Sequence, residues 1–399
     1  MKAVSDRINK LSESQTIAMA KRSRELQAEG KDIISLSLGE PDFNTPDIIK
    51  EAAKQAIDDN YSTYTPVSGY LDLREAIAKK FKRDNNLTYT PNQIVASTGA
   101  KQSIANVVLS LVNPGDEVIL PAPYWVSYYE IIKMADGVPV VIDTNIESDF
   151  KITAQQLKGA MTANTKLMIF SSPCNPTGSI YSKSELESLA GIIASKEDFY
   201  VIADEIYVHI NFVGGHESLA QFDSIYDKVI TINGVSKGFA MTGWRLGYIG
   251  AAEWIAKACD KIQGQFTSGT CSITQRAVIA AMEIDPKTSE VTSMKDAFKE
   301  RRDYMINRLN VIEGVVINQP EGAFYVFPNI KALFGKSWEG GKIQTATDLS
   351  MYLLEKAEVA LVTGEAFGSP ECIRISYASS LEVLKEAMDR VEKALKELN

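Results

Sequence analysis

A single lysine in an apolar, glycine-containing stretch is the first residue of chemical interest. The stretch is NGVSKGFAMTGWRLGYIG, Asn233 to Gly250, with Lys237 between Ser236 and Gly238. Because an ammonium group is costly to bury without a partner, Lys237 either lies on a surface turn or is a buried amine that takes part in a reaction. Arg245 follows eight positions later, and its guanidinium can present two parallel donors to a phosphate. Neighbouring motifs must decide between these interpretations.

Two further motifs follow apolar runs that have the composition of strands. Asp204 ends the run FYVIAD (199–204), and Tyr207 comes shortly after it. A carboxylate at the end of so apolar a strand is costly to bury unless it meets a cation, which favours a functional role for Asp204. The sequence NPTG, which begins at Asn175, is a strong turn signal, and by itself it fits a simple turn as well as a binding site.

Two weaker signals stand after the runs QIVAS and EVILP. Gly99 and Ala100 precede a helical pattern, and the free N–H groups of a helix N-terminus suit a phosphate. An ordinary turn from strand to helix has the same pattern. Tyr124 and Trp125, in APYWVSYYE, fit either packing in the core or a flat surface for a planar ring.

The order of these motifs is more informative than any one of them. Open α/β sheets bind ligands at the carboxyl ends of their strands. A phosphate turn, an aromatic platform, an amide, a carboxylate and a lysine follow successive predicted strands here. Pyridoxal phosphate needs these parts, because a lysine forms a Schiff base with its aldehyde and a carboxylate keeps its pyridine nitrogen protonated. The sequence therefore predicts a pyridoxal-phosphate site.

Three blocks carry a resemblance to a known family. SSPCNPTGSIYS, YVIADEIY and NGVSKGFAMTGWRLGYI resemble the signature blocks of the class I aminotransferases of fold type I, and most closely those of the bacterial aspartate aminotransferases. The resemblance runs almost end to end, from SLGEPDFNTP near Gly39 to CIRISYA around Arg374. It implies a pyridoxal-phosphate enzyme that exchanges amino groups by a ping-pong scheme.

The resemblance also implies a role for each matching residue. Lys237 is expected to form the Schiff base and to take the α-proton of the substrate, and Arg374 to bind the substrate α-carboxylate. The cofactor-binding residues it implies are Gly99, Ala100, Lys101, Trp125, Asn175, Asp204, Tyr207, Ser236, Lys237, Arg245 and, from a neighbouring subunit, Tyr64. The substrate-binding residues it implies are Gly39, Trp125, Asn175, Arg374, Lys101 and Thr16, with Ser14 beside Thr16.

The expected substrates are L-aspartate and 2-oxoglutarate, because Lys101 and Thr16 stand where relatives bind the distal carboxylate. Alanine, aromatic amino acids and prephenate remain alternatives. Ser12 stands where prephenate-using members carry a lysine, which argues against that activity. A lyase of the same fold is a further alternative. The alternative outside enzymes is a ligand-sensing regulator, which would add a basic helix-turn-helix segment that we do not expect here.

Short apolar runs alternate with helical patterns along the chain. Most of these runs are apolar on both faces, as in strands covered by helices on each side. The fold expected is therefore α/β, the pyridoxal-phosphate transferase fold type I, with a mainly parallel seven-stranded sheet in a large domain and a smaller α+β domain. We expect an N-terminal segment (1–45), a large cofactor-binding domain (46–290) and a C-terminal small domain (291–399). The strand-like runs are 33–38, 93–97, 117–121, 139–143, 166–171, 199–204, 228–232 and 246–250.

Composition excludes several classes of function. The chain has 399 residues and a formal net charge of -9, which argues against a nucleic-acid or membrane-surface role. Its four cysteines are far apart and it has two histidines, so neither a disulfide framework nor a metal site is expected. No apolar run is long enough for a membrane span or a signal peptide. A cytoplasmic homodimer is the expected form.

Overall fold

A seven-stranded sheet is the largest element of the computed structural model, which describes residues 4–13 and 15–399. One strand, β8 (Gly247–Gly250), pairs antiparallel with both of its neighbours, and every other pairing in the sheet is parallel. The mainly parallel sheet expected from the sequence is therefore confirmed. In spatial order the strands are β2 (Ile94–Ser97), β8 (Gly247–Gly250), β7 (Val229–Gly234), β6 (Tyr200–Asp204), β5 (Thr165–Ser171), β3 (Glu117–Pro121) and β4 (Val138–Ile142).

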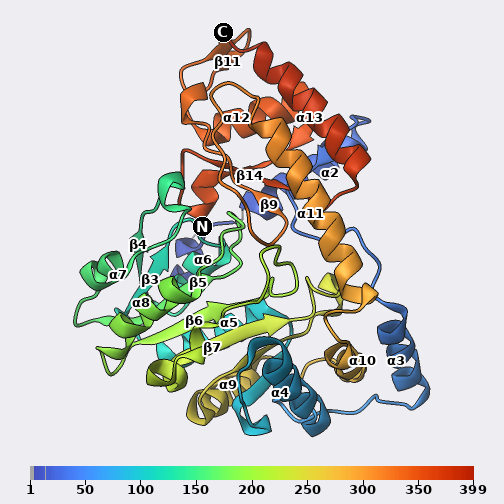
Figure 1. Cartoon of the computed structure of the whole chain (residues 1–399), viewed down its shortest axis with the longest axis vertical. Coiled ribbons are helices and arrows are strands. Elements are labelled where there is room, and N and C mark those ends of the chain that lie inside the picture. Colours follow the sequence, from blue (N-terminus) through green and yellow to red (C-terminus); the bar gives the residue numbers. More distant parts are fainter. Residues whose placement is uncertain (1–3, 14) are drawn as a thin grey trace.

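Helices cover both faces of this sheet (Figure 1). Successive residues of β6 face different cores: Val201 and Ala203 join one hydrophobic cluster and Ile202 joins the other. The two-sided burial explains why the strands lack an alternating pattern. The helices of one face are α5 (Ala100–Leu111), α6 (Ser127–Met134) and α9 (Glu253–Phe266); those of the other include α3 (Asp47–Asp58), α4 (Leu71–Asn85), α7 (Ala154–Ala160), α8 (Lys183–Ala194) and α10 (Ser272–Glu283).

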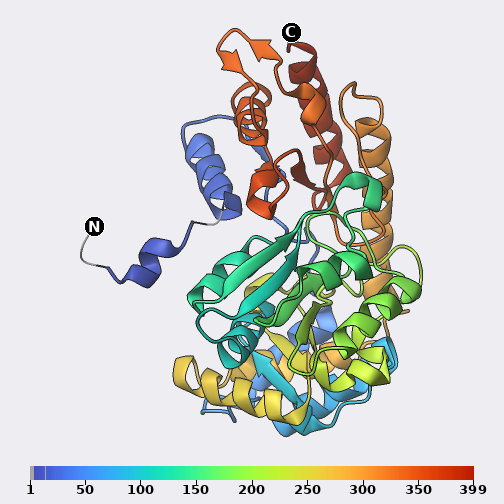
Figure 2. The same ribbon diagram turned by 90° about the vertical axis from the view of Figure 1, so that its left-hand side faces the viewer.

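The C-terminal third forms a second core together with part of the N-terminal segment. Its strands β9 (Tyr325–Val326), β13 (Val362–Thr363) and β14 (Ile373–Ser376) make a three-stranded antiparallel sheet. The run 33–38 is not part of the large sheet, because β1 (Ile34–Ser35) pairs in parallel with β12 (Val359–Ala360). The helices of this region are α2 (Gln15–Ala28), α11 (Ser289–Leu309), α12 (Ala346–Tyr352) and α13 (Leu381–Lys396). Figure 2 shows α2 beside the C-terminal elements.

The N-terminal segment therefore contacts the C-terminal third, while the boundaries at residues 45 and 290 stay a prediction. Among the helices of residues 4–13 and 15–399, none is long and apolar enough to cross a membrane.

Candidate active site

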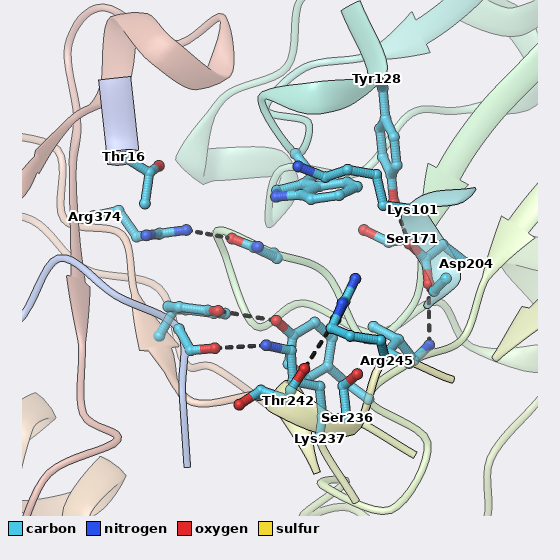
Figure 3. Close-up of a pocket in the computed structure, with 17 residues that line it drawn as sticks. Thr16, Lys101, Tyr128, Ser171, Asp204, Ser236, Lys237, Thr242, Arg245 and Arg374 are labelled. Atoms are coloured by element: carbon cyan, nitrogen blue, oxygen red, sulfur yellow. Dashed lines mark hydrogen bonds between the residues drawn. The ribbon is translucent and has the colours of Figure 1, made fainter. Parts of the chain in front are cut away.

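A cavity of about 290 Å³ lies at the carboxyl ends of β5, β6 and β7, beside the core that the C-terminal third forms with part of the N-terminal segment (Figure 3). Ser171 and Asp204 end β5 and β6, and Lys237 follows the last residue of β7 by three positions. Strand ends thus position the residues that carry chemistry, as the α/β architecture predicts. The residues expected from the sequence that line the cavity are Thr16, Gly39, Ala100, Lys101, Trp125, Asn175, Asp204, Tyr207, Ser236, Lys237, Arg245 and Arg374.

Lys237 is a partly buried amine in the wall of the cavity and does not lie on a surface turn. Its Nζ donates a hydrogen bond to the carbonyl oxygen of Gly39 at 2.5 Å. Burial lowers the pKa of Lys237 to about 8; Glu40 opposes this shift, and the positive charges of Arg374 and Arg245 add to it. The lowered pKa increases the share of the neutral amine at neutral pH, and this is the form that can accept a proton or attack a carbonyl carbon.

Asp204 is a buried carboxylate that also lines the cavity. Its Oδ2 accepts a hydrogen bond from the Tyr128 hydroxyl at 2.6 Å, and its Oδ1 accepts one from the Ile206 N–H at 3.1 Å. Burial raises the pKa of Asp204 to about 6, and the hydrogen bond from Tyr128 opposes that rise. Within the described ranges Asp204 has no ion pair, so a cation in the cavity would stabilise its charged form.

Arg374 is a buried cation that meets no carboxylate among the described residues. It is 2% exposed, and burial lowers its pKa from the ordinary value. Its guanidinium donates to Asn175 Oδ1 at 3.0 Å and to the Ser37 carbonyl at 2.6 Å, while its Nε has no partner in the part of the chain that the structure describes. The guanidinium lies between two aromatic rings, those of Tyr325 and Phe367. A buried guanidinium with a free donor suits a carboxylate.

The N-terminus of α5 forms a cradle in which backbone and a guanidinium come close together. Gly99, its N-cap, has φ +86°, and a Cβ there would lie 2.3 Å from Arg245 Nη2. A Cβ on Gly247 of β8 would lie 2.2 Å from the Ala100 nitrogen. No ion pair of Arg245 occurs among residues 4–13 and 15–399. Together with the Ser236 hydroxyl, these donors fit a phosphate.

Lys101 and Trp125 form another wall of the cavity. Lys101 Nζ lies 4.9 Å from the centre of the Trp125 ring, and burial together with Arg245 lowers the pKa of this lysine. Thr16, from α2, also reaches the cavity (Figure 3). Ser14, which the sequence placed beside Thr16, lies outside the described residues.

Two expected residues do not line the cavity. Gly99 lies directly behind the cavity wall as the N-cap of α5, next to Arg245. Tyr64 is 97% exposed and is not among the residues that form this cavity. Ser12 is also exposed, and its backbone N–H donates to Glu130.

Five lining residues were not predicted from the sequence. Tyr128 has the clearest function among them, because it hydrogen-bonds Asp204. It lies in the aromatic run APYWVSYYE, where only its spacing of three residues from Trp125 could have indicated it. Tyr325 comes from β9, and its hydroxyl lies 2.9 Å from that of Tyr207. The other three are Ser171, Ile206 and Thr242.

Comparison with known proteins agrees with this arrangement. The profile of the family "Aminotransferase class I and II" matches residues 31–391. A Petunia hybrida protein described as a bifunctional aspartate aminotransferase and glutamate/aspartate-prephenate aminotransferase is 46% identical over 98% of this chain and 83% of its own. An aspartate/prephenate aminotransferase of Cereibacter sphaeroides is 44% identical over 98% of both chains.

Solved structures give the same result. The crystal structure of an aspartate aminotransferase from Rhizobium meliloti superposes with a TM-score of 0.96 at 38% identity, over 99% of both chains. An aspartate aminotransferase from Thermus thermophilus, solved with maleate, has a TM-score of 0.92 at 36% identity, over 99% of this chain and 100% of its own. The similarity covers the chain from end to end and includes the elements that form the cavity. This chain belongs to the class I and II aminotransferase family.

Proposed function

We propose that this aminotransferase moves the α-amino group of L-aspartate to 2-oxoglutarate. The observation that carries the proposal is the charge of the cavity: Asp204 is its only carboxylate, within the described residues, against four cationic side chains. These are Lys101, Lys237, Arg245 and Arg374. Such an excess of positive charge requires anionic ligands, and a dicarboxylate substrate with a phosphorylated cofactor supplies them.

Pyridoxal phosphate is the cofactor of this family and therefore of this enzyme. When bound, it supplies an aldehyde that reacts with amines and a ring that accepts electrons. The donors at Gly99 and Ala100, with Ser236 and Arg245, would hold its phosphate, and Asp204 its pyridine nitrogen. Trp125 would contact the face of the ring, and Asn175 with Tyr207 its phenolic oxygen. The unpaired Asp204 and the Gly99 cradle are the structural features that fit this group.

The protein's own residues would then bind and orient the substrate. Arg374 would bind the α-carboxylate, with Gly39 and Asn175 beside it, because its Nε is a free buried donor. Lys101 and Thr16 would bind the distal carboxylate. With both ends of the substrate held, Lys237 would remove the proton from Cα as a neutral amine, and its lowered pKa supports that role.

A homodimer with shared active sites is part of the proposal. Tyr64 is 97% exposed, and Ile57 and Leu71 are more than half exposed. A subunit interface that joins such side chains into one apolar patch would bury them. Tyr64 would reach the cofactor phosphate of the neighbouring subunit. A cytoplasmic location stays a prediction of the sequence.

Prephenate is a second candidate acceptor, because two relatives with more than 40% identity carry it in their names. Ser12 at the position where a lysine is expected argues against it. If the Ser12→Lys variant gains prephenate turnover that the wild type lacks, this interpretation of Ser12 is supported.

A panel of amino donors with 2-oxoglutarate tests the proposed substrate. We expect aspartate to have the highest kcat/KM, and Lys101→Ala to lower that value by about 10- to 100-fold while alanine turnover changes little. Lys166→Ala is the matched control, because Lys166 Nζ also lies over an aromatic ring, that of Tyr200, away from the cavity. Preference for alanine or an aromatic donor would contradict aspartate specificity, and release of ammonia in place of glutamate would indicate a lyase.

A further inference from the structure

A second group of buried charges lies on the other side of the strand ends, behind the cavity. None of its members lines the cavity. It joins α4 to the loop that follows β6, and it contains both histidines of the chain. We name it the back cluster; its residues are Lys80, Asp84, Asn85, Glu205, His209, His216 and Ser218.

Glu205 is the centre of the back cluster. Its Oε2 accepts hydrogen bonds from Asn85 Nδ2 and from the Ser218 hydroxyl, each at 2.8 Å. His216 Nε2 lies 2.9 Å from the same oxygen, although the ring is not turned so that either nitrogen completes a hydrogen bond within the described residues. Glu205 is 2% exposed, so these groups replace the water that a carboxylate otherwise requires.

The charges of α4 balance the carboxylates of the cluster. Lys80 Nζ donates to Asn85 Oδ1 at 3.0 Å and lies 3.7 Å from Asp84 Oδ2. Burial lowers the pKa of Lys80 to about 8, against the opposing effect of Asp84 and Glu205. Arg83 also pairs with Asp84. Two cations therefore face two carboxylates, while burial and Lys80 lower the pKa of His209 to about 3 and keep it neutral.

The back cluster touches the backbone next to both key residues of the active site. Glu205 directly follows Asp204, and its N–H donates to the Ile232 carbonyl at 2.9 Å, which joins the end of β6 to β7. On the lysine side, a Cβ on Gly238 would lie 2.6 Å from His209 Cδ2. The glycine after Lys237 is thus required by the close approach of a back-cluster side chain.

We propose that Glu205 is a positioning residue for Asp204: the back cluster holds its carboxylate behind the end of β6, where it fixes both the place and the charge state of Asp204. The inference rests on the proposed function, in which Asp204 contacts the cofactor. Adjacent residues at a strand end point to opposite sides, so one carboxylate faces the cavity and the other faces α4. The negative charge of Glu205, on the adjacent residue, disfavours the ionised form of Asp204.

The charge state of Asp204 follows from all the groups around it. Burial raises its pKa to about 6, Glu205 adds to the rise, and Tyr128 and Lys237 oppose it. Removing the charge of Glu205 should therefore make Asp204 easier to ionise, and removing a cation beside Glu205 should do the opposite. The ionisable groups that face the two carboxylates are Tyr128 of α6; Lys237 after β7; Lys80, Arg83 and Asp84 of α4; Tyr207, His209 and His216 after β6; and Tyr89 and Tyr248 beside Glu205.

The test is the pH dependence of cofactor binding. The full-length protein is freed of cofactor, and the dissociation constant of pyridoxal phosphate is measured by protein fluorescence from about pH 5 to about pH 8.5. In the wild type we expect affinity to fall as the pH drops through about 6, because protonated Asp204 no longer pairs with the pyridinium. In Glu205→Gln, which keeps an acceptor oxygen for Asn85 and Ser218, this fall should move to lower pH by roughly half a unit or more.

Three further variants make the result decisive. Glu187→Gln removes the same charge from an exposed position on α8 and should leave the fall in place. Lys80→Met removes a cation beside Glu205 and should move the fall to higher pH, so the proposal remains falsifiable even if Glu205→Gln folds poorly. Asp204→Asn should remove the part of the fall that Asp204 causes and leave the part due to Lys237 and to the cofactor phosphate, whose second pKa is about 6. If Asp204→Asn leaves binding unchanged, the proposed role of Asp204 is wrong, and this inference with it. If Asp204→Asn makes the fall smaller but Glu205→Gln and Lys80→Met leave it in place, only the role of Glu205 is overturned.

Discussion

The two sides of the same strand ends hold buried charge in opposite ways. Behind β6, each carboxylate of the back cluster meets a cation or several donors, and the charges balance. In front of β6, Arg374 is as deeply buried and, within the described residues, meets no carboxylate. A buried cluster whose charges compensate one another stabilises the fold. A buried cluster with uncompensated charge is suited to bind ligands of the opposite charge. Burial alone does not distinguish a binding site; missing counter-ions do.

Two lysines, one in the cavity and one in the back cluster, provide a test of this comparison. Burial lowers the pKa values of Lys237 and Lys80 alike to about 8, yet only Lys237 lines the cavity. Lys237→Ala should lower kcat by about 10⁴-fold, because it removes both the covalent anchor and the base. Lys80→Met should stay within about tenfold of wild-type kcat at pH 8. Steady-state kinetics and borohydride fixation of the cofactor measure both. Near-normal turnover of Lys237→Ala would rule out its role as the base.

For the free energy of unfolding we expect the reverse order: a substitution in the back cluster should have a larger effect than one in the cavity. Asp84→Ala leaves Lys80 as a buried charge with a weaker partner, and we expect the free energy of unfolding to fall by about 3 kcal/mol. Arg374→Met removes a cation that has no counter-ion in the described part of the chain, and it should leave the cofactor-free protein within about 1 kcal/mol of wild type, or make it more stable. Denaturant unfolding of the cofactor-free proteins measures the difference.

Binding of a dicarboxylate completes that measurement. A saturating dicarboxylate such as maleate should stabilise the wild type and Asp84→Ala, but not Arg374→Met, because it binds where the unpaired guanidinium lies. If Arg374→Met were as destabilising as Asp84→Ala, Arg374 would be a structural cation and the distinction between the two sides would fail.

Much of the front side could be predicted from the sequence, because it is built from local patterns. The seven strands of the large sheet coincide with apolar runs; Asp204 ends one of these runs, and Asn175 and Lys237 follow others within a few residues. A strand end is a local feature, and the α/β topology brings such ends together without further information.

What the sequence could not predict depends on long-range contacts. Tyr325 reaches the cavity because β9, which belongs to the C-terminal third of the chain, lies beside it. Tyr128 is one of several aromatic residues in its stretch of sequence, and only the position of α6 shows that its hydroxyl contacts Asp204. The back cluster joins residues 80–85 to residues 205–218, and no local pattern links them.

The smallest expected effect concerns the hydrogen bond between the Tyr128 hydroxyl, in the wall of the cavity, and Asp204. Tyr128 donates to Asp204, and burial keeps the pKa of this phenol far above its ordinary value, so it remains a donor at neutral pH. Tyr128→Phe keeps the ring and removes the donor. Since that hydrogen bond opposes the rise in the pKa of Asp204, its loss should raise this pKa by about one unit or less.

Cofactor affinity should then fall at a higher pH in Tyr128→Phe than in wild type, the direction opposite to Glu205→Gln. Above the pKa of Asp204 in either protein the two affinities should converge, because Asp204 is ionised in both. Tyr129→Phe is the matched control, as Tyr129 is the next residue of α6 and stacks on Tyr124. An equal loss of affinity at every pH would mean that the Tyr128 hydroxyl only packs against the site. A shift with convergence would mean that Asp204 is tuned from both sides, by a donor in front and a carboxylate behind.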